Sequence, residues 1–257
     1  MSQVKEAPVV LDVRNFSTGY RGNPVIRDVS LQSRGGQLTC IVGPNGCGKS
    51  TLLKGLAGVL APMGGSISLH GEDVTGKKTP ELALSGVGYV PQLKDVFGPL
   101  TVQENLELGG YALSRSKTSE RIDAVVEMFP RLKEMLTRHA GNLSGGERKM
   151  LAVARVLMLE PKLLLLDEPT AGLTEELAHR MLEEQLSGVM RAGVAVVLVE
   201  QRANIALHAS DYAYLLTSGQ VRREGPSSEL LADPTFAEVF LGGEGATGIR
   251  ATSWSKQ

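Results

Sequence analysis

The sequence of 257 residues predicts an α/β fold whose core is a parallel β-sheet. Residues 38–42 are apolar at nearly every position, and a glycine-rich loop and a helical pattern at residues 52–60 follow them. Residues 163–166 and 195–199 are also apolar without alternation, which is typical of strands covered on both faces of a parallel sheet. Helical patterns between these runs fit the alternation of strands and helices in this fold class.

The N-terminal part of the chain predicts a second, antiparallel sheet. Side chains alternate along residues 9–14 as they do on a strand, and a second short run covers residues 25–31. The turn-forming residues of segment 19–24 separate the two runs. We therefore expect two adjacent antiparallel strands here.

The middle of the chain shows no strand pattern between residues 101 and 158. Thr101 and Glu104 have the spacing of a capping box at a helix start. Apolar residues then recur with helical spacing from Ile122 to Phe129. This segment predicts a helical insert.

These patterns divide the chain into one domain and a tail. The domain covers residues 1–242, and its helical subdomain covers about residues 90–160. Residues 243–257 are rich in Gly, Ala, Ser and Thr without any period, and we expect them to be disordered.

Composition excludes several classes of protein. The formal net charge is −1 and only 4% of residues are aromatic, so no nucleic-acid partner is expected. No apolar stretch approaches the roughly 17–25 residues of a membrane-spanning helix, so a membrane role would come through a partner. Two cysteines are too few for a disulfide framework and no signal-peptide pattern occurs, so the expected location is the cytoplasm.

Residues 43–50 match the phosphate-loop pattern G-x-x-x-x-G-K-[ST]. The glycines let backbone N–H groups surround a phosphate, Lys49 neutralises β- and γ-phosphate oxygens, and the Ser50 hydroxyl is suited to Mg²⁺. The alternative is a glycine-rich turn without a ligand, but the strand before it and the helix after it favour a nucleoside triphosphate. The expected nucleotide-binding residues of this loop are Gly43, Asn45, Gly46, Gly48, Lys49, Ser50 and Thr51.

Two adjacent carboxylates follow the apolar run at residues 163–166. Ligands of open α/β sheets collect at the carboxyl ends of the strands. We expect Asp167 to hold Mg²⁺ and Glu168 to polarise the attacking water as a general base. Alternatively, both are solvated loop carboxylates.

A third element is the segment at residues 143–147. Ser144 and Glu147 have capping-box spacing before a helical pattern, which alone indicates only a helix start. The paired glycines Gly145 and Gly146 also leave the N–H groups of that helix start open to a second phosphate. The chain would then have two faces that contact nucleotide.

Four segments occur in a characteristic order: residues 43–51, Gln92, residues 143–147 and residues 164–168. With them the chain resembles the ATP-binding subunits of ABC transporters, over about residues 9–242. The resemblance implies a P-loop NTPase cassette with a parallel core sheet, an antiparallel N-terminal β subdomain and a helical signature subdomain. It implies ATP and Mg²⁺ as cofactors. It also implies a dimer that holds two ATP molecules head to tail, so that Ser144, Gly145 and Gly146 contact the ATP of the other cassette.

The same resemblance implies roles for two residues with weaker local signals. Tyr20 matches the aromatic residue that stacks on adenine, and Gln92 matches the residue that contacts Mg²⁺ and relays the state of the nucleotide. Without the family, Tyr20 indicates a packed tyrosine at a strand end, and Gln92 a surface amide.

Two positions depart from the general family pattern. Gln201 stands where most cassettes have a histidine, and it can bond to a γ-phosphate but cannot carry positive charge. We expect it to take part in catalysis with Lys49 and Glu168. Thr174 stands where an aspartate is usual, which alters a polar contact across the dimer.

Within the family, the resemblance is greatest to one of the two cassettes of branched-chain amino acid importers, close to those of urea and amide importers. It is carried by residues 90–92, 96–97, 101–106, 199–201 and 240–243. It implies an ATPase that powers uptake of a small solute, located at the inner face of the plasma membrane. The implied partners are a second, non-identical cassette, membrane permease subunits and, indirectly, a periplasmic or lipid-anchored solute-binding protein. A soluble ABC scaffold and an export cassette are the alternatives.

Overall fold

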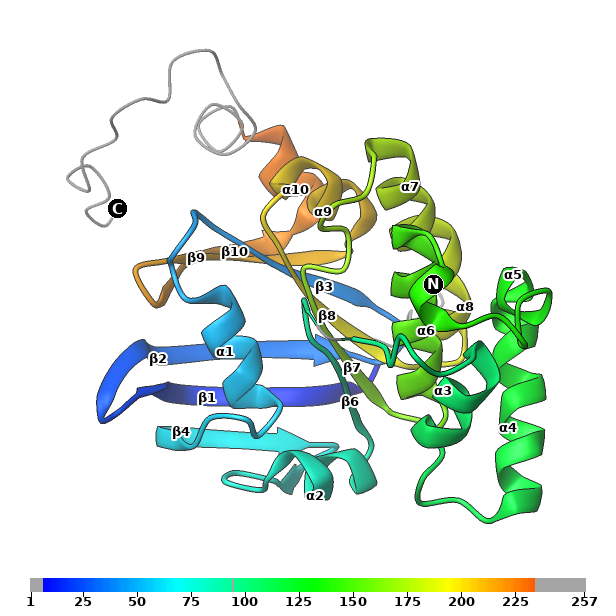
Figure 1. Ribbon diagram of the computed structural model, residues 1–257. Coiled ribbons are helices and arrows are strands. Elements are labelled where there is room, and N and C mark those ends of the chain that lie inside the picture. The colour runs from blue at the N-terminus through cyan, green and yellow to red at the C-terminus, as the bar shows by residue number, and fades with distance from the viewer. Residues whose placement is uncertain (1–6, 94, 234–257) are drawn as a thin grey trace, which may run out of the picture.

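The protein, described by a computed structural model over residues 7–93 and 95–233, contains two β-sheets with helices packed on them (Figure 1). Among these residues, no helix combines the length and the apolar character that a membrane crossing requires. The boundary expected at residue 242 and the tail expected to be disordered lie outside the described residues.

The central sheet has six strands, and all but β10 run parallel. Its spatial order is β10 (Gln220–Pro226), β9 (Tyr212–Thr217), β3 (Leu38–Val42), β8 (Ala195–Glu200), β7 (Leu163–Asp167) and β6 (Val87–Val90). Every residue of β3, β7 and β8 is buried, as the unbroken apolar runs predicted. The strand that leads into the phosphate loop therefore lies inside the sheet.

The second sheet is antiparallel and contains the N-terminal strands. Its order is β2 (Asn23–Arg34), β1 (Val9–Tyr20), β4 (Pro62–Leu69) and β5 (Glu72–Asp73). The predicted pair of strands is confirmed, although both strands extend well beyond the predicted runs. Tyr20 pairs with Asn23, so the hairpin closes directly after the tyrosine.

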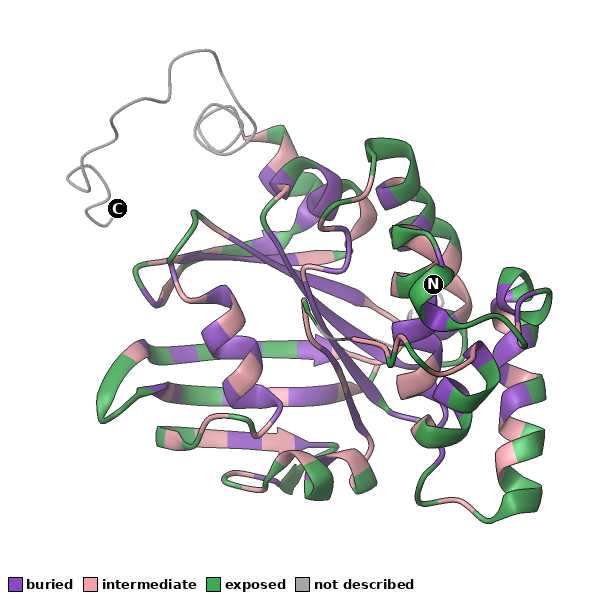
Figure 2. Ribbon diagram, in the orientation of Figure 1, coloured by how far each residue is buried: buried purple, intermediate pink, exposed green. Residues whose placement is uncertain are grey.

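Helix α1 (Lys49–Leu56) lies between the two sheets (Figure 1). Its buried leucines Leu52 and Leu53 share one apolar cluster with Phe16 of β1 and Ile41 of β3. Figure 2 shows β3, and parts of β1 and of α1, as buried. The phosphate loop that starts α1 is therefore anchored on both sides.

The opposite face of the central sheet carries a helical layer. Residues 101–158 form α3 (Val102–Gly109), α4 (Arg115–Met128), α5 (Pro130–Lys133), the 3₁₀ turn Ala140–Asn142 and α6 (Gly145–Leu157). Apolar residues of α6, including Leu151, pack in a cluster with Cys40 of β3 and Leu164 of β7. The helical insert is thus observed, with one isolated antiparallel bridge between Thr101 and His139.

The remaining helices complete both faces. They are α2 (Thr79–Leu84), α7 (Glu175–His179), the π-helical turn Arg180–Gln185, α8 (Leu186–Arg191), α9 (Ala203–Ala209) and α10 (Ser227–Ala232). The helix predicted at residues 52–60 was placed too late, because it begins at Lys49 directly after the loop. It ends by Ala57, since Gly58 has a φ of 70° that a helix cannot continue.

Candidate nucleotide-binding site

Three strand ends gather the candidate residues at one edge of the central sheet. Val42, the last residue of β3, is in register with Glu200, and Asp167 of β7 is in register with Val199. Because these strands are parallel, the phosphate loop, the carboxylates after β7 and the residues after β8 all lie at the carboxyl edge. This is the edge where open α/β sheets bind ligands.

The phosphate loop is shaped by its glycines. Gly46 and Gly48 have φ values of 76° and 107°, which side chains with a Cβ rarely adopt. A Cβ at Gly43 would overlap the carbonyl oxygen of Leu216. The path of the loop backbone thus favours glycine at positions 46 and 48 and leaves no room for a Cβ at position 43.

Lys49 closes over the loop that precedes it. Its side chain is buried, and Nζ donates hydrogen bonds to the carbonyl oxygens of Gly43 at 2.8 Å and Pro44 at 3.2 Å. Asn45 and Gly46, at the tip of the loop, are exposed. The ammonium group therefore lies within the curve of the loop, where a phosphate would replace its carbonyl partners.

Ser50 and Asp167 meet at the start of α1. Ser50 Oγ donates a 2.8 Å hydrogen bond to Asp167 Oδ1, and the Tyr89 hydroxyl lies 3.5 Å from Oδ2. Burial raises the pKa of Asp167, and the bond from Ser50 opposes that rise. A hydroxyl and a carboxylate at this distance form the oxygen donor set that Mg²⁺ prefers.

Glu168 lies beside Asp167 but is held differently. Its backbone is in the left-handed region, with φ of 47°, and its N–H donates to the carbonyl oxygen of Val199 at 3.0 Å. Gln92 Nε2 donates a 2.6 Å hydrogen bond to Glu168 Oε2. Burial raises the pKa of Glu168, and the negative charges of Glu200 and Asp167 raise it further.

Gln201 follows β8 and is exposed. Its backbone N–H donates to Glu200 Oε2 at 3.2 Å, and its side chain forms no hydrogen bond with any described residue. The amide is therefore free to meet a ligand that lies over the strand ends.

Tyr20 ends β1 and is 45% exposed. Tyr20 is therefore not enclosed, whereas a tyrosine that only packs at the strand end would be. Thr51, next to Ser50 in α1, is buried.

The segment of Ser144 and the two glycines that follow starts α6. Ser144 Oγ accepts from Glu147 N at 3.3 Å, and Glu147 Oε2 accepts from Ser144 N at 2.9 Å, so the predicted capping box is formed. The N–H groups of Gly145 and Gly146 belong to the first turn, whose donors have no intrahelical acceptor. Because α6 and α1 cover opposite faces of the central sheet, these residues are not gathered with the phosphate loop.

The sequence reasoning missed several residues that hold the site. Glu200 is buried and accepts from Thr170 N at 2.9 Å and Thr170 Oγ1 at 2.6 Å, which fixes the loop after Glu168. Asn105 is fully buried and bonds to backbone atoms of Phe97, Leu100 and Thr101. Asn105 lies in the predicted helix start, but no local pattern indicates its partners.

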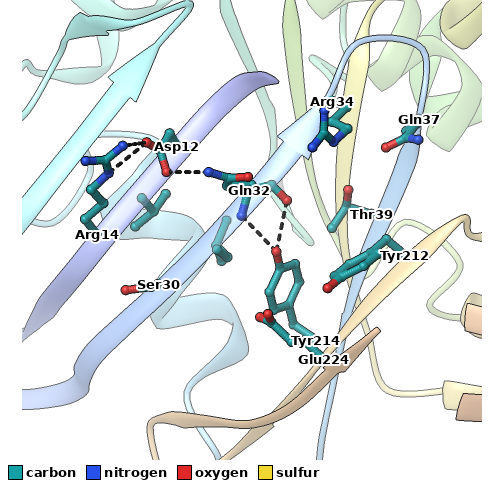
Figure 3. Close-up of a pocket in the computed structure, with 12 residues that line it drawn as sticks. Asp12, Arg14, Ser30, Gln32, Arg34, Gln37, Thr39, Tyr212, Tyr214 and Glu224 are labelled. Carbon is teal, nitrogen blue, oxygen red and sulfur yellow. Dashed lines mark hydrogen bonds and ion pairs between the residues drawn. The ribbon is translucent and has the colours of Figure 1, made fainter. Parts of the chain in front are cut away.

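A pocket of about 500 Å³ lies elsewhere, between β1–β2 and β9–β10 (Figure 3). Tyr214 reaches across it, and its hydroxyl accepts from Gln32 N at 2.9 Å. Thr39 in its wall is near the start of β3, whereas the phosphate loop follows the end of that strand. The pocket is therefore separate from the candidate site.

Comparison with known proteins gives consistent matches. The ABC transporter family model matches residues 26–171. The chain is 41% identical over 236 residues to the high-affinity branched-chain amino acid transport ATP-binding protein BraG of Pseudomonas aeruginosa, covering 91% of this chain and 100% of that protein. It is 38% identical over 227 residues to the probable branched-chain amino acid transport ATP-binding protein LivF of Archaeoglobus fulgidus, covering 88% of this chain and 96% of that protein. A crystal structure of the ADP conformation of an ATP-binding cassette of an ABC transporter matches with a TM-score of 0.82 at 28% identity, covering 91% of this chain and 99% of that one.

Proposed function

The chain belongs to the ABC transporter family as an ATP-binding subunit with ATPase activity, and from this premise we propose that it powers the import of branched-chain amino acids. The similarity to BraG supports this solute class, because the match covers the whole length of BraG. ATP is the substrate, and the energy of its hydrolysis is the chain's contribution to transport.

The phosphate loop holds the ATP phosphates in this proposal. The loop N–H groups and Lys49 stabilise the negative charge that develops on the γ-phosphate during transfer to water. Lys49 is already inside the loop, bonded to two carbonyl oxygens, so a phosphate replaces weak neutral acceptors with charged ones. Tyr20, at its exposed strand end, stacks on the adenine ring.

The proposed Mg²⁺ ligands are Ser50 and Asp167, with Gln92 as a further contact. The 2.8 Å approach of the Ser50 hydroxyl to the Asp167 carboxylate supports this assignment, because both are hard oxygen donors. When bound, Mg²⁺ supplies positive charge against the phosphate oxygens.

Glu168 is the proposed general base. Its raised pKa brings proton acceptance closer to neutral pH, and the hydrogen bond from Gln92 orients the carboxylate. Gln201, whose side chain is free, bonds to the γ-phosphate from the end of β8. Water attacks the γ-phosphorus as Glu168 takes its proton, and ADP leaves.

The active form in this proposal is a pair of cassettes. Ser144, Gly145 and Gly146 start a helix that packs in another apolar cluster than α1, and their open N–H groups contact the ATP of the partner cassette. The departures at Thr174 and Gln201 favour a second cassette that is not identical to this one. The domain of residues 1–242, with its helical subdomain at about 90–160, is the unit that pairs.

Permease subunits carry the solute in this proposal, and a periplasmic or lipid-anchored binding protein delivers it. The cassette is then peripheral at the cytoplasmic face of the membrane. This assignment rests on the relatives' role in transport, and on the lack of any membrane-crossing helix among the described residues.

Uptake by cells tests the solute class. The host strain without this gene is complemented with the wild-type chain or with Glu168→Gln, and labelled leucine, isoleucine, valine, urea and acetamide are supplied. We expect only the wild type to restore uptake of the three amino acids. Restored urea or acetamide uptake with unchanged leucine uptake would replace the proposed solute.

A further inference from the structure

Lys149 connects two parts of the molecule that are far apart in sequence. It lies in α6, little more than one turn after Ser144. Its Nζ donates a 2.7 Å hydrogen bond to the carbonyl oxygen of Gln92 and forms a 2.9 Å ion pair with Asp95 Oδ2. Both partners lie in the segment that follows β6.

This ion pair is shielded from water. The side chains of Lys149 and Asp95 are only 12% and 14% exposed. Exposed ion pairs contribute little because water and salt screen them, but shielded pairs that also have hydrogen bonds are stronger and fix geometry. A second ion pair of α6, between Arg131 and Glu147, is longer at 3.5 Å and has an exposed arginine.

Separate contacts hold the far end of the same segment. Asn105 bonds to both backbone groups of Phe97, and the Arg155 guanidinium lies 5.0 Å from the centre of the Phe97 ring. Lys149, in α6, holds the beginning of the segment through the carbonyl oxygen of Gln92. The Gln92 side chain in turn reaches Glu168.

We propose that Lys149 is a positioning residue that couples the start of α6 to the proposed base at Glu168. The connection runs from α6 through Lys149 to the backbone and side chain of Gln92, and then to Glu168. Because the start of α6 faces the partner's ATP, a nucleotide bound there changes the placement of Glu168 in this chain's own site. This inference rests on the proposed function, in which the phosphate loop binds this chain's ATP and the start of α6 contacts the partner's ATP.

Four single variants of the full-length chain, and the double variant of Lys149→Met with Asp95→Asn, test the coupling. Lys149→Met removes the ammonium group and keeps a long side chain, whereas Lys149→Arg keeps a cation that can pair with Asp95. Asp95→Asn removes the other charge. Lys133→Met, at an exposed lysine of the same helical layer, is the matched control for loss of one positive charge.

Steady-state hydrolysis of MgATP by each variant, assembled with its partner cassette whose own site is disabled, gives the first readout. We expect Lys149→Met to lower kcat about 5- to 30-fold and change KM less than about threefold, as for loss of a typical coupling between sites. Asp95→Asn should act in the same direction, and the double variant should be no worse than Lys149→Met because both remove one interaction. Lys149→Arg should recover most of the rate, and Lys133→Met should match the wild type.

Hydrogen exchange gives a second readout that does not need turnover. In the wild type, a non-hydrolysable ATP analogue should slow exchange both in the segment after β6 and in the first turn of α6. In Lys149→Met only the segment after β6 should respond. A purely structural role would instead raise exchange in both places with and without nucleotide, and Lys149→Arg would not restore the response.

The proposal is overturned if Lys149→Met keeps the wild-type kcat and the wild-type exchange response in α6. It is also overturned if Lys149→Arg is as impaired as Lys149→Met. A wild-type chain that binds ATP but does not hydrolyse it even in the assembled pair of cassettes would instead contradict the proposed function, and the exchange experiment would still decide the coupling.

Discussion

Gln92 and Glu168 are joined by a 2.6 Å hydrogen bond although they lie 76 residues apart. Each stands two positions beyond the neighbouring strand pair Val90 and Leu166, which are in register in the parallel sheet. The pairing of β6 with β7 therefore brings the amide to the carboxylate. Any movement of the segment after β6 changes the surroundings of the proposed base.

Glu168→Gln should bind ATP normally and hydrolyse it about 10²–10⁴ times more slowly, the usual range for loss of a positioned general base. The replacement amide can still accept the hydrogen bond from Gln92, so the site keeps its shape but has no proton acceptor. Single-turnover hydrolysis and binding of a fluorescent ATP analogue measure the two effects. Glu176→Gln, at an exposed residue of α7, is the control, and a loss below threefold at position 168 would remove Glu168 as the base.

As the pH is lowered, the rate of hydrolysis should begin to fall at a higher pH than it would if the base were a glutamate with an ordinary pKa. A base must be deprotonated, and burial with the nearby charges of Glu200 and Asp167 raises the pKa of Glu168. Activity is thus complete above that raised pKa and is lost as the pH falls through it, so the acid limb lies above the usual value of about 4.3. A pH profile of kcat in three buffers measures this limb.

Gln92→Leu supplies the companion measurement. The hydrogen bond from Gln92 favours the charged carboxylate, so removing it should move the acid limb to still higher pH. In Glu168→Gln the limb should be absent. An acid limb that stays in place in both variants would belong to another group.

The sequence predicted the interior strands well because burial on two faces leaves an unambiguous pattern. Residues 38–42 coincide with β3, and β7 and β8 extend the predicted runs by one residue each. β6 was not predicted as a strand, because four residues with a glycine carry too little pattern. Strand β4 was missed for a related reason, since its two glycines interrupt the alternation of apolar and polar residues.

The sequence indicates those parts of the candidate site whose residues are neighbours along the chain. The phosphate loop and the pair Asp167 and Glu168 each form a contiguous motif beside a strand. Lys149 could not be recognised, because a charged residue in a helix next to Arg148 indicates a solvated face. Its partners lie 54 and 57 residues away, and their meeting depends on how α6 packs against the sheet.

Gln201→Ala should slow hydrolysis by about one to two orders of magnitude, because a hydrogen bond to a charged partner contributes roughly 1.5–3 kcal/mol. The free side chain of Gln201 at the end of β8 fits this role. Gln201→His should add a pH-dependent step near about pH 6.5, where histidine changes charge. Turnover measured with the partner's own site disabled decides this, and a wild-type rate for Gln201→Ala would mean that Gln201 only ends the strand.

Neither cysteine should react quickly with a thiol reagent in the folded, nucleotide-free chain. Burial raises the pKa of Cys40 to about 12 and also raises the pKa of Cys47, so little reactive thiolate forms near pH 8. An Ellman titration should show no fast phase before denaturation and two thiols after it. Thr137→Cys, at an exposed position, supplies a fast-reacting control, and equally fast reaction of the wild type would contradict the burial of Cys47.

Thr170→Val should lower the free energy of unfolding by about 1.5–3 kcal/mol, the usual contribution of a hydrogen bond to a charged group. The fully buried Thr170 hydroxyl donates to Glu200 Oε1 at 2.6 Å, and valine keeps the volume but leaves the buried carboxylate one donor short. Urea unfolding measures the change, and Thr137→Val, at an exposed position, is the control. The slope of the unfolding free energy against urea concentration should stay the same, which shows that the folded and unfolded states of the variant are comparable with those of the wild type. Thr170→Ser retains the hydroxyl and should lose less than Thr170→Val. A valine variant as stable as the wild type would mean that water replaces the hydroxyl, and that Glu200 does not hold the loop after Glu168 in place through this bond.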